Sequence, residues 1–185
     1  MWIDSHCHLN HEKIAALGSA DKLIQNAKNQ NVDGLLTICC LISEELEELL
    51  EITNRHNNVW CSVGTHPHNA GHDDEKTITT DDIVVLANKH PNIIGIGETG
   101  LDYYYDYSPR EDQFTAFRKH IQACLVTGLP LIVHTRDAEE DTMAIIREEN
   151  HGSLKGVMHC FSGSAQLAEQ ASAEGFYISF SGILT

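Results

Sequence analysis

The chain has 185 residues, 42% of them hydrophobic, which is enough for one domain with a sizeable buried core. It carries 27 acidic and 12 basic residues, a formal net charge of −15. Such a charge repels a polyanion at long range, so it argues against a broad nucleic-acid-binding surface and allows only a local site that recruits cations.

The N-terminus lacks a basic segment followed by an apolar stretch, so no signal peptide is predicted, and no apolar run is long enough to cross a membrane. The six cysteines show no C-x-x-C spacing, and most of them lie in apolar runs. The cysteines are therefore expected to be buried free thiols in a reducing compartment, which favours a cytoplasmic protein. We expect no membrane association and no obligate protein partner.

Seven apolar, β-rich runs recur along the chain, and longer segments of helical character separate them. The runs cover residues 2–9, 32–40, 58–66, 92–102, 129–136, 154–163 and 176–185. Strands that are apolar on both faces are typical of a parallel sheet whose two sides are covered.

The clearest helices are expected at residues 43–56, 79–91, 108–128 and 164–175. In the third of these, Ser108 is expected to be the N-cap of an S-x-x-E capping box, and Gly128 suits the C-terminal stop. The acidic runs 44–48 and 137–142 are predicted to be solvated helix faces.

The alternation of strand and helix in units of about 30 residues indicates βαβ repeats. A doubly wound open sheet would carry a glycine-rich phosphate loop after the first strand, whereas this chain has His-x-His there. We therefore predict an α/β fold of the (β/α)8 TIM-barrel type, in a single domain over residues 1–185. The length accounts for about seven of the eight βα units, because a full barrel has roughly 250 residues.

Polar residues interrupt these apolar strands near their C-terminal ends. In the first run, His6 and His8 alternate with Cys7, so the two imidazoles project to the same face. Later runs carry the further polar residues His66, Glu98, His134 and His159. A barrel gathers the C-terminal ends of all its strands at one mouth, so these residues are expected to converge there.

A divalent metal centre explains this convergence better than separate buried histidines do. Four neutral imidazoles and one carboxylate, His6, His8, Glu98, His134 and His159, would otherwise each need its own hydrogen-bond partner. Nitrogen ligands suit Zn, Ni, Co or Fe, and a bridging carboxylate suits a pair of ions and also Mg or Mn.

The stretches "IDSHCHL", "VGTHPH", "GIGETGLDYYYDYSPREDQ", "LPLIVHTRDA" and "HCFSG" resemble the TatD family of metal-dependent deoxyribonucleases, within the amidohydrolase superfamily. The resemblance runs in order from residue 2 to residue 185. It implies two divalent ions (Mg, Mn, Zn or similar). The resemblance further implies that His6 and His8 hold one metal ion and that His134 and His159 hold the second. Glu98 would bridge the two ions. The resemblance also implies that Glu98 is the catalytic carboxylate.

The same resemblance links His66 to the substrate phosphate. The local sequence, a histidine beside a proline at a strand end, fits a loop-capping role equally well. The aromatic rings of residues 103–105 could stack on bases, and packing of these rings over the barrel mouth is an equally good explanation. Among them, Tyr103 is the candidate for substrate binding. We expect His11, His68 and His72 on the surface, and Arg110 in a surface ion pair.

Three functions remain open at this point. The first is a phosphodiester hydrolase acting on DNA, single-stranded or at a 3′ end, and the resemblance implies 3′-5′ exonuclease trimming. The second is a small-molecule amidohydrolase that cleaves an amide, ester or lactone. The third is an inactive metal-binding fragment.

The family pattern includes one more ligand, an aspartate at the end of an eighth strand, and the given sequence ends at Thr185 in the seventh run. We expect the 185-residue chain alone to be C-terminally truncated, associated or poorly soluble, and weak in hydrolase activity. The run 176–185 has high β-propensity and no charge, so it is an aggregation hazard as an edge strand.

Overall fold

A computed structural model describes residues 2–182, and it contains a single sheet of seven parallel strands in the order β1 to β7. The strands are β1 (Trp2–Cys7), β2 (Val32–Thr37), β3 (Val59–Val63), β4 (Ile93–Asp102), β5 (Leu131–Arg136), β6 (Gly156–Met158) and β7 (Phe176–Ile178). Each strand pairs with the next along the chain, without the reversal of strand order that a doubly wound sheet requires.

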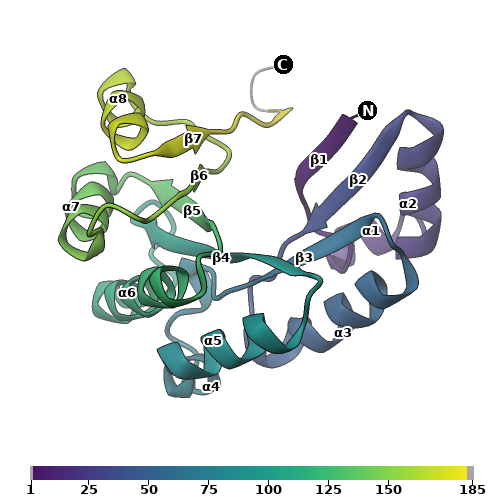
Figure 1. The fold of residues 1–185 in the computed structure, drawn as a ribbon, viewed down its shortest axis with the longest axis horizontal. Coiled ribbons are helices and arrows are strands. Elements are labelled where there is room, and N and C mark those ends of the chain that lie inside the picture. The colour runs from purple at the N-terminus through teal and green to yellow at the C-terminus, as the bar shows by residue number, and fades with distance from the viewer. Residues whose placement is uncertain (1, 183–185) are drawn as a thin grey trace.

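The sheet is curled, and α2 (Ala20–Asn29), α3 (Ile42–Arg55), α5 (Thr80–Lys89), α6 (Arg110–Thr127), α7 (Glu139–Glu149) and α8 (Ala165–Ala173) lie along its outer side (Figure 1). The shorter elements are α1 (Glu12–Ala15), the 3-10 turn η1 (Pro67–Asn69) and α4 (Asp73–Thr77). The predicted barrel type with about seven βα units is confirmed. Within residues 2–182, no helix combines the length and apolarity needed to cross a membrane.

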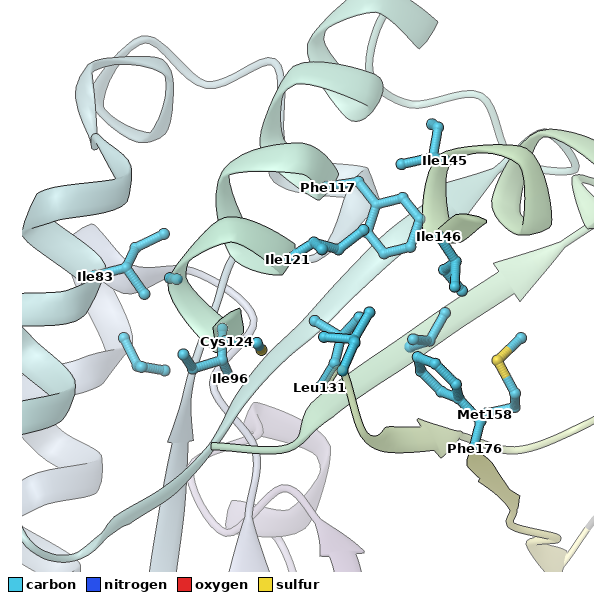
Figure 2. Packing of buried hydrophobic residues seen from close by; sticks show 14 of the residues in the cluster. Ile83, Ile96, Phe117, Ile121, Cys124, Leu131, Ile145, Ile146, Met158 and Phe176 are labelled. Atoms are coloured by element: carbon cyan, nitrogen blue, oxygen red, sulfur yellow. The ribbon is translucent and has the colours of Figure 1, made fainter. Parts of the chain in front are cut away.

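The main core lies between the outer helices and the sheet. Phe117 and Ile121 of α6 and Ile146 of α7 are fully buried against Leu131 of β5 and Met158 of β6 (Figure 2). Burying side chains of this size stabilises the fold by roughly 1.5–3 kcal/mol each. This packing anchors β5 and β6 to the helices that cover them.

The four clearest predicted helices are present as α3, α5, α6 and α8, and Gly128 ends α6 in a left-handed conformation with φ +74°. The predicted capping box at Ser108 is wrong. The N-cap of α6 is Pro109, and no side chain caps this helix. The buried Ser108 hydroxyl instead accepts a hydrogen bond from Gly71 N–H and donates one to the carbonyl of His68, at 2.9 and 2.7 Å.

The last two strands are shorter than the apolar runs that predicted them. Pairing between β6 and β7 covers three residue pairs, from Gly156 with Phe176 to Met158 with Ile178. Residues 159–163 of the sixth run, including His159, and residues 179–181 of the seventh therefore lie beyond the ladder. Residues 183–185 of the seventh run lie outside the described residues.

A buried histidine outside the polar strand ends predicts how stability depends on pH. His120 of α6 accepts a hydrogen bond from Thr65 N–H at Nε2 and donates from Nδ1 to the carbonyl of Ala116. Burial lowers the pKa of His120 from 6.5 to about 4. The unfolded chain therefore binds the extra proton first, and the stabilisation is present above pH 6.5 and lost as the pH falls towards 4.

The pKa difference of His120 corresponds to about 3 kcal/mol of unfolding free energy. We expect His120→Gln to flatten the loss of stability between pH 6.5 and 4, as measured by urea unfolding in the presence of a chelator. His72→Gln is the control, because His72 is exposed and should keep the wild-type slope. Equal slopes in all three proteins would contradict this assignment.

Candidate metal centre

The polar residues predicted at the strand ends do converge. His6 lies in β1 and His8 just beyond it, Glu98 lies in β4 and His134 in β5. His66 and His159 follow the ends of β3 and β6. All of these strands belong to the same parallel sheet, so their C-terminal ends lie along one edge of the curled sheet.

Glu98 is the centre of this cluster. Its Oε1 lies 3.0 Å from His134 Nδ1, and its Oε2 lies 3.1 Å from His6 Nε2. The carboxylate is buried, and burial by itself would raise its pKa, but the hydrogen bond from His134 and the nearby ring of His6 outweigh burial and hold the pKa of Glu98 well below its usual range. Glu98 is therefore a buried carboxylate anion at neutral pH.

The histidines pack closely around it. The rings of His6 and His159 are stacked with centroids 3.1 Å apart, and His6 and His8 are 5.1 Å apart, so the predicted projection of His6 and His8 to one face is confirmed. Potential ligand atoms within 4.8 Å of one another form three groups. The groups are His6 with Glu98 and His159, His8 with Cys40 and Glu98, and His66 with His68 and His134.

This grouping differs from the pairing implied by the family resemblance, in which His6 and His8 share one metal and His134 and His159 share the other. Glu98 belongs to two of the three groups. A carboxylate shared between neighbouring groups has the geometry of a bridge between two cations.

A cavity of about 450 Å³ opens over the cluster. Its lining includes His8, Cys40, His66, His68, Glu98, His134 and His159. Among residues 2–182, no lysine or arginine lines it. Cations bound at the same place would therefore be the main source of positive charge for an anionic substrate group, beside the histidines themselves.

The donor atoms present fit a divalent cation. His6 Nε2 is buried and has no hydrogen-bond partner within the described chain, although a carboxylate oxygen of Glu98 lies 3.1 Å away. A buried polar atom without a partner is costly, and a cation between this nitrogen and the oxygen would satisfy both. Imidazole nitrogens with a carboxylate are the ligand types of catalytic zinc and of related divalent metals.

Glycines in β4 allow the close strand contacts that place Glu98. Gly100 pairs with His134 in the ladder and has φ +141°. A Cβ added to Gly100 would lie 2.0 Å from the carbonyl oxygen of His134, and one added to Gly64 would lie 2.3 Å from the backbone of Gly97. Side chains at these positions would push apart the two strands that carry the cluster.

We expect Gly100→Ala to lower the free energy of unfolding by about 2–5 kcal/mol, because it combines backbone strain with a backbone clash. Gly182→Ala is the matched control, since an added Cβ there meets nothing within 4 Å and no strained φ applies. Chemical denaturation of both variants gives the comparison. A Gly100→Ala protein as stable as Gly182→Ala would show that β4 and β5 tolerate separation.

Asp102 belongs to the site, and the sequence reasoning missed it. It is fully buried at the end of β4, and its Oδ2 accepts hydrogen bonds from Nε2 of both His134 and His68, each at 2.9 Å. Its Oδ1 accepts from the backbone N–H groups of Tyr104 and Tyr105. Burial alone would lower the pKa of His134, but the hydrogen bonds with Asp102 and Glu98 outweigh it and raise that pKa to about 9.

His68 is not the free surface residue that was predicted. It lines the cavity, and its ring is tied to the buried carboxylate of Asp102. The reason is the turn η1, which Ser108 anchors through the carbonyl of His68 and which bends this residue back towards β4. His72 is exposed, as predicted, and His11 is exposed at the rim of the cavity.

Of the two roles considered for His66, the structure shows the loop-capping one, and the phosphate role stays a prediction. Its Nδ1 accepts a hydrogen bond from His68 N–H, which is the capping role. Burial lowers the pKa of His66 to about 3, so the ring is neutral and its proton lies on Nε2. That Nε2–H points into the cluster, 3.3 Å from His134 Nδ1 and 3.6 Å from Glu98 Oε1.

Tyr103 does not line the cavity over the cluster. Its hydroxyl donates to Asp141, and its ring lies under the guanidinium of Arg110 at 3.8 Å, beside a separate hollow formed by residues 137–141. Arg110 also lies 3.9 Å from Asp106 in an exposed ion pair. The tyrosines nearest the cluster are Tyr105 and Tyr107, whose rings meet the ring of His68 edge-on.

A curled parallel sheet with a histidine–carboxylate cluster at its carboxyl edge is the architecture of metal-dependent hydrolases with a TIM-barrel-like fold. The chain belongs to the family described as TatD related DNase, whose model matches residues 3–185.

Comparison with known proteins agrees with this assignment. The chain is 32% identical over 187 residues to the uncharacterized metal-dependent hydrolase YabD of Bacillus subtilis, covering all of this chain and 70% of that protein. It is 29% identical over 162 residues to the 3'-5' ssDNA/RNA exonuclease TatD of Salmonella typhimurium, covering 88% of this chain and 61% of that protein.

Among solved structures, a hydrolase TatD family protein from Entamoeba histolytica has the same fold, with a TM-score of 0.82 at 23% identity. The match covers 97% of this chain and 64% of that one, so the chain spans just under two thirds of the length of this structural neighbour.

Proposed function

We propose that this protein is a divalent-metal-dependent phosphodiester hydrolase that removes nucleotides from the 3′ end of single-stranded DNA. The observation that carries the proposal is the buried Glu98 carboxylate, which faces ring nitrogens from two other strands beneath an open cavity. The name of the Salmonella relative and the family description support DNA as the substrate.

The proposed ligands are His6, His8, Glu98, His134 and His159, with Glu98 shared between two ions. Cations held there would supply a hydroxide from bound water at neutral pH and neutralise the charge of a phosphodiester. Because no lysine or arginine among residues 2–182 lines the cavity, we expect DNA to bind much more tightly when divalent cations are present.

The chain's own residues would position the substrate. His66 Nε2–H is a neutral donor directed into the cluster, suited to a non-bridging phosphate oxygen. Asp102 orients His134 and His68 from behind. The exposed rings of Tyr105 and Tyr107, which contact His68, offer a surface on which the terminal base could stack.

The test is hydrolysis of single-stranded DNA labelled at either end. The enzyme is in excess over DNA, so that the cleavage products can be detected even if the reaction is slow. With Mg, Mn, Zn or Co ions, the 5′-labelled strand should shorten step by step, and the 3′ label should be released first as a mononucleotide. A chelator should stop both reactions.

A small-molecule amidohydrolase is the second candidate, because a cavity of about 450 Å³ suits a small ligand and the net charge of −15 disfavours DNA. The same preparation is therefore assayed on cyclic amides and lactones. Hydrolysis of those compounds without any cleavage of DNA would replace the first proposal with the second.

A further inference from the structure

Cys40 lies at the cavity, in the loop that follows β2, and its backbone is held on both sides. Its N–H donates to Glu45 Oε2 at 2.7 Å, and its carbonyl accepts from His66 N–H and Asn69 Nδ2, each at 2.9 Å. Glu45 was expected on a solvated helix face, and it is half-buried because of this bond. The position of Cys40 beside the cluster is therefore fixed by three hydrogen bonds.

The Cys40 sulfur lies among atoms that can bind a metal. Sγ is 3.9 Å from His8 Nδ1, and one ligand atom each from His8, Cys40 and Glu98 lie within 4.8 Å of one another. Bond lengths of about 2.3 Å for sulfur and 2.0–2.1 Å for nitrogen put the two ligand atoms of a tetrahedral site about 3.5 Å apart. A shift of a few tenths of an ångström would bring sulfur and nitrogen to that spacing.

A second observation points to a cation at this place. His6 Nε2 is buried without a hydrogen-bond partner in the described chain, and it lies 3.1 Å from the same Glu98 carboxylate that completes the group with Cys40. The other cavity cysteine, Cys160, directs its sulfur to the hydroxyl of Ser181 at 2.8 Å. The two thiols at the cavity are therefore not equivalent.

We propose that Cys40 is a thiolate ligand of the metal position that includes His8 and Glu98, and that it makes this position selective for thiophilic cations such as Zn²⁺ and Co²⁺ over Mg²⁺ and Mn²⁺. The proposal rests on the metal centre of the proposed function. When the cation binds, the thiol proton leaves to solvent and the sulfur–metal bond takes its place.

The test is the absorption spectrum of the metal-free protein after addition of Co²⁺. A cobalt–thiolate bond gives a near-ultraviolet charge-transfer band, whereas histidine and carboxylate ligands alone do not. We expect the band in the wild type and in Cys160→Ser, and its loss in Cys40→Ser. In equilibrium dialysis, Cys40→Ser should lower the preference for Zn²⁺ over Mn²⁺ by about 10-fold or more.

The outcomes separate the two proposals. Cobalt bound to the wild type without a charge-transfer band overturns the role of Cys40 and leaves the metal-dependent hydrolase intact. No binding of any divalent cation overturns both. If Cys40→Ser fails to fold, the wild-type and Cys160→Ser spectra still decide, because only these two cysteines line the cavity among the described residues.

Discussion

Glu98→Gln should lose bound metal and at least about 10²–10³-fold of any cation-dependent hydrolysis, while its far-ultraviolet circular dichroism stays that of the wild type. The substitution keeps the shape of the side chain and removes the charge that faces His6 and His134. An amide offers a single acceptor oxygen, so it cannot bridge two cations as a carboxylate does.

The measurement is metal content by elemental analysis after dialysis, together with the single-turnover rate on labelled DNA. Glu111→Gln serves as the control, because it removes the same charge from an exposed position in the first turn of α6. Wild-type metal content and rate in Glu98→Gln would show that the carboxylate neither holds metal nor takes part in the reaction.

Asp102→Asn should weaken metal binding by about 10–100-fold, the range found when a carboxylate behind a metal-binding histidine is removed. Both oxygens of Asp102 face donors: Oδ2 faces two imidazole N–H groups and Oδ1 faces two backbone N–H groups. An asparagine amide must therefore direct its NH₂ group at N–H donors in either orientation, which leaves buried donors unpaired.

Asp106→Asn is the matched control, since Asp106 lies four residues further on, is exposed, and adopts a positive φ that asparagine tolerates. Metal affinity from isothermal titration calorimetry distinguishes the two variants, and thermal melting without metal measures stability separately. Equal metal affinities in Asp102→Asn and Asp106→Asn would mean that the orientation of His134 does not depend on Asp102.

Much of the architecture is readable from the sequence because it follows local periodicity. Apolar runs alternate with amphipathic helices, and that alternation alone predicts a parallel α/β sheet. The convergence of Glu98 and His134 was predictable for the same reason, since parallel strands present their carboxyl ends at one edge.

The residues that were missed act through tertiary contacts that leave no local pattern. In the sequence, Asp102 is one more polar residue at the end of an apolar run. Its role is visible only from the strand register, which pairs it with Arg136, two residues beyond His134 on β5. His68 and Ser108 are joined across a sequence separation of 40 residues, so neither the turn η1 nor the loss of the capping box could be inferred locally. In the sequence, Cys40 is one of several cysteines in apolar runs, and only the structure shows that it lies beside His8.

The most direct test of the metal centre is anomalous X-ray scattering from crystals of the protein soaked in Zn²⁺ or Mn²⁺. We predict anomalous peaks at the carboxyl edge of the sheet, within about 2.0–2.3 Å of a Glu98 oxygen and of histidine nitrogens. Cations found only on the acidic exterior, with none among His6, Glu98 and His134, would contradict the account.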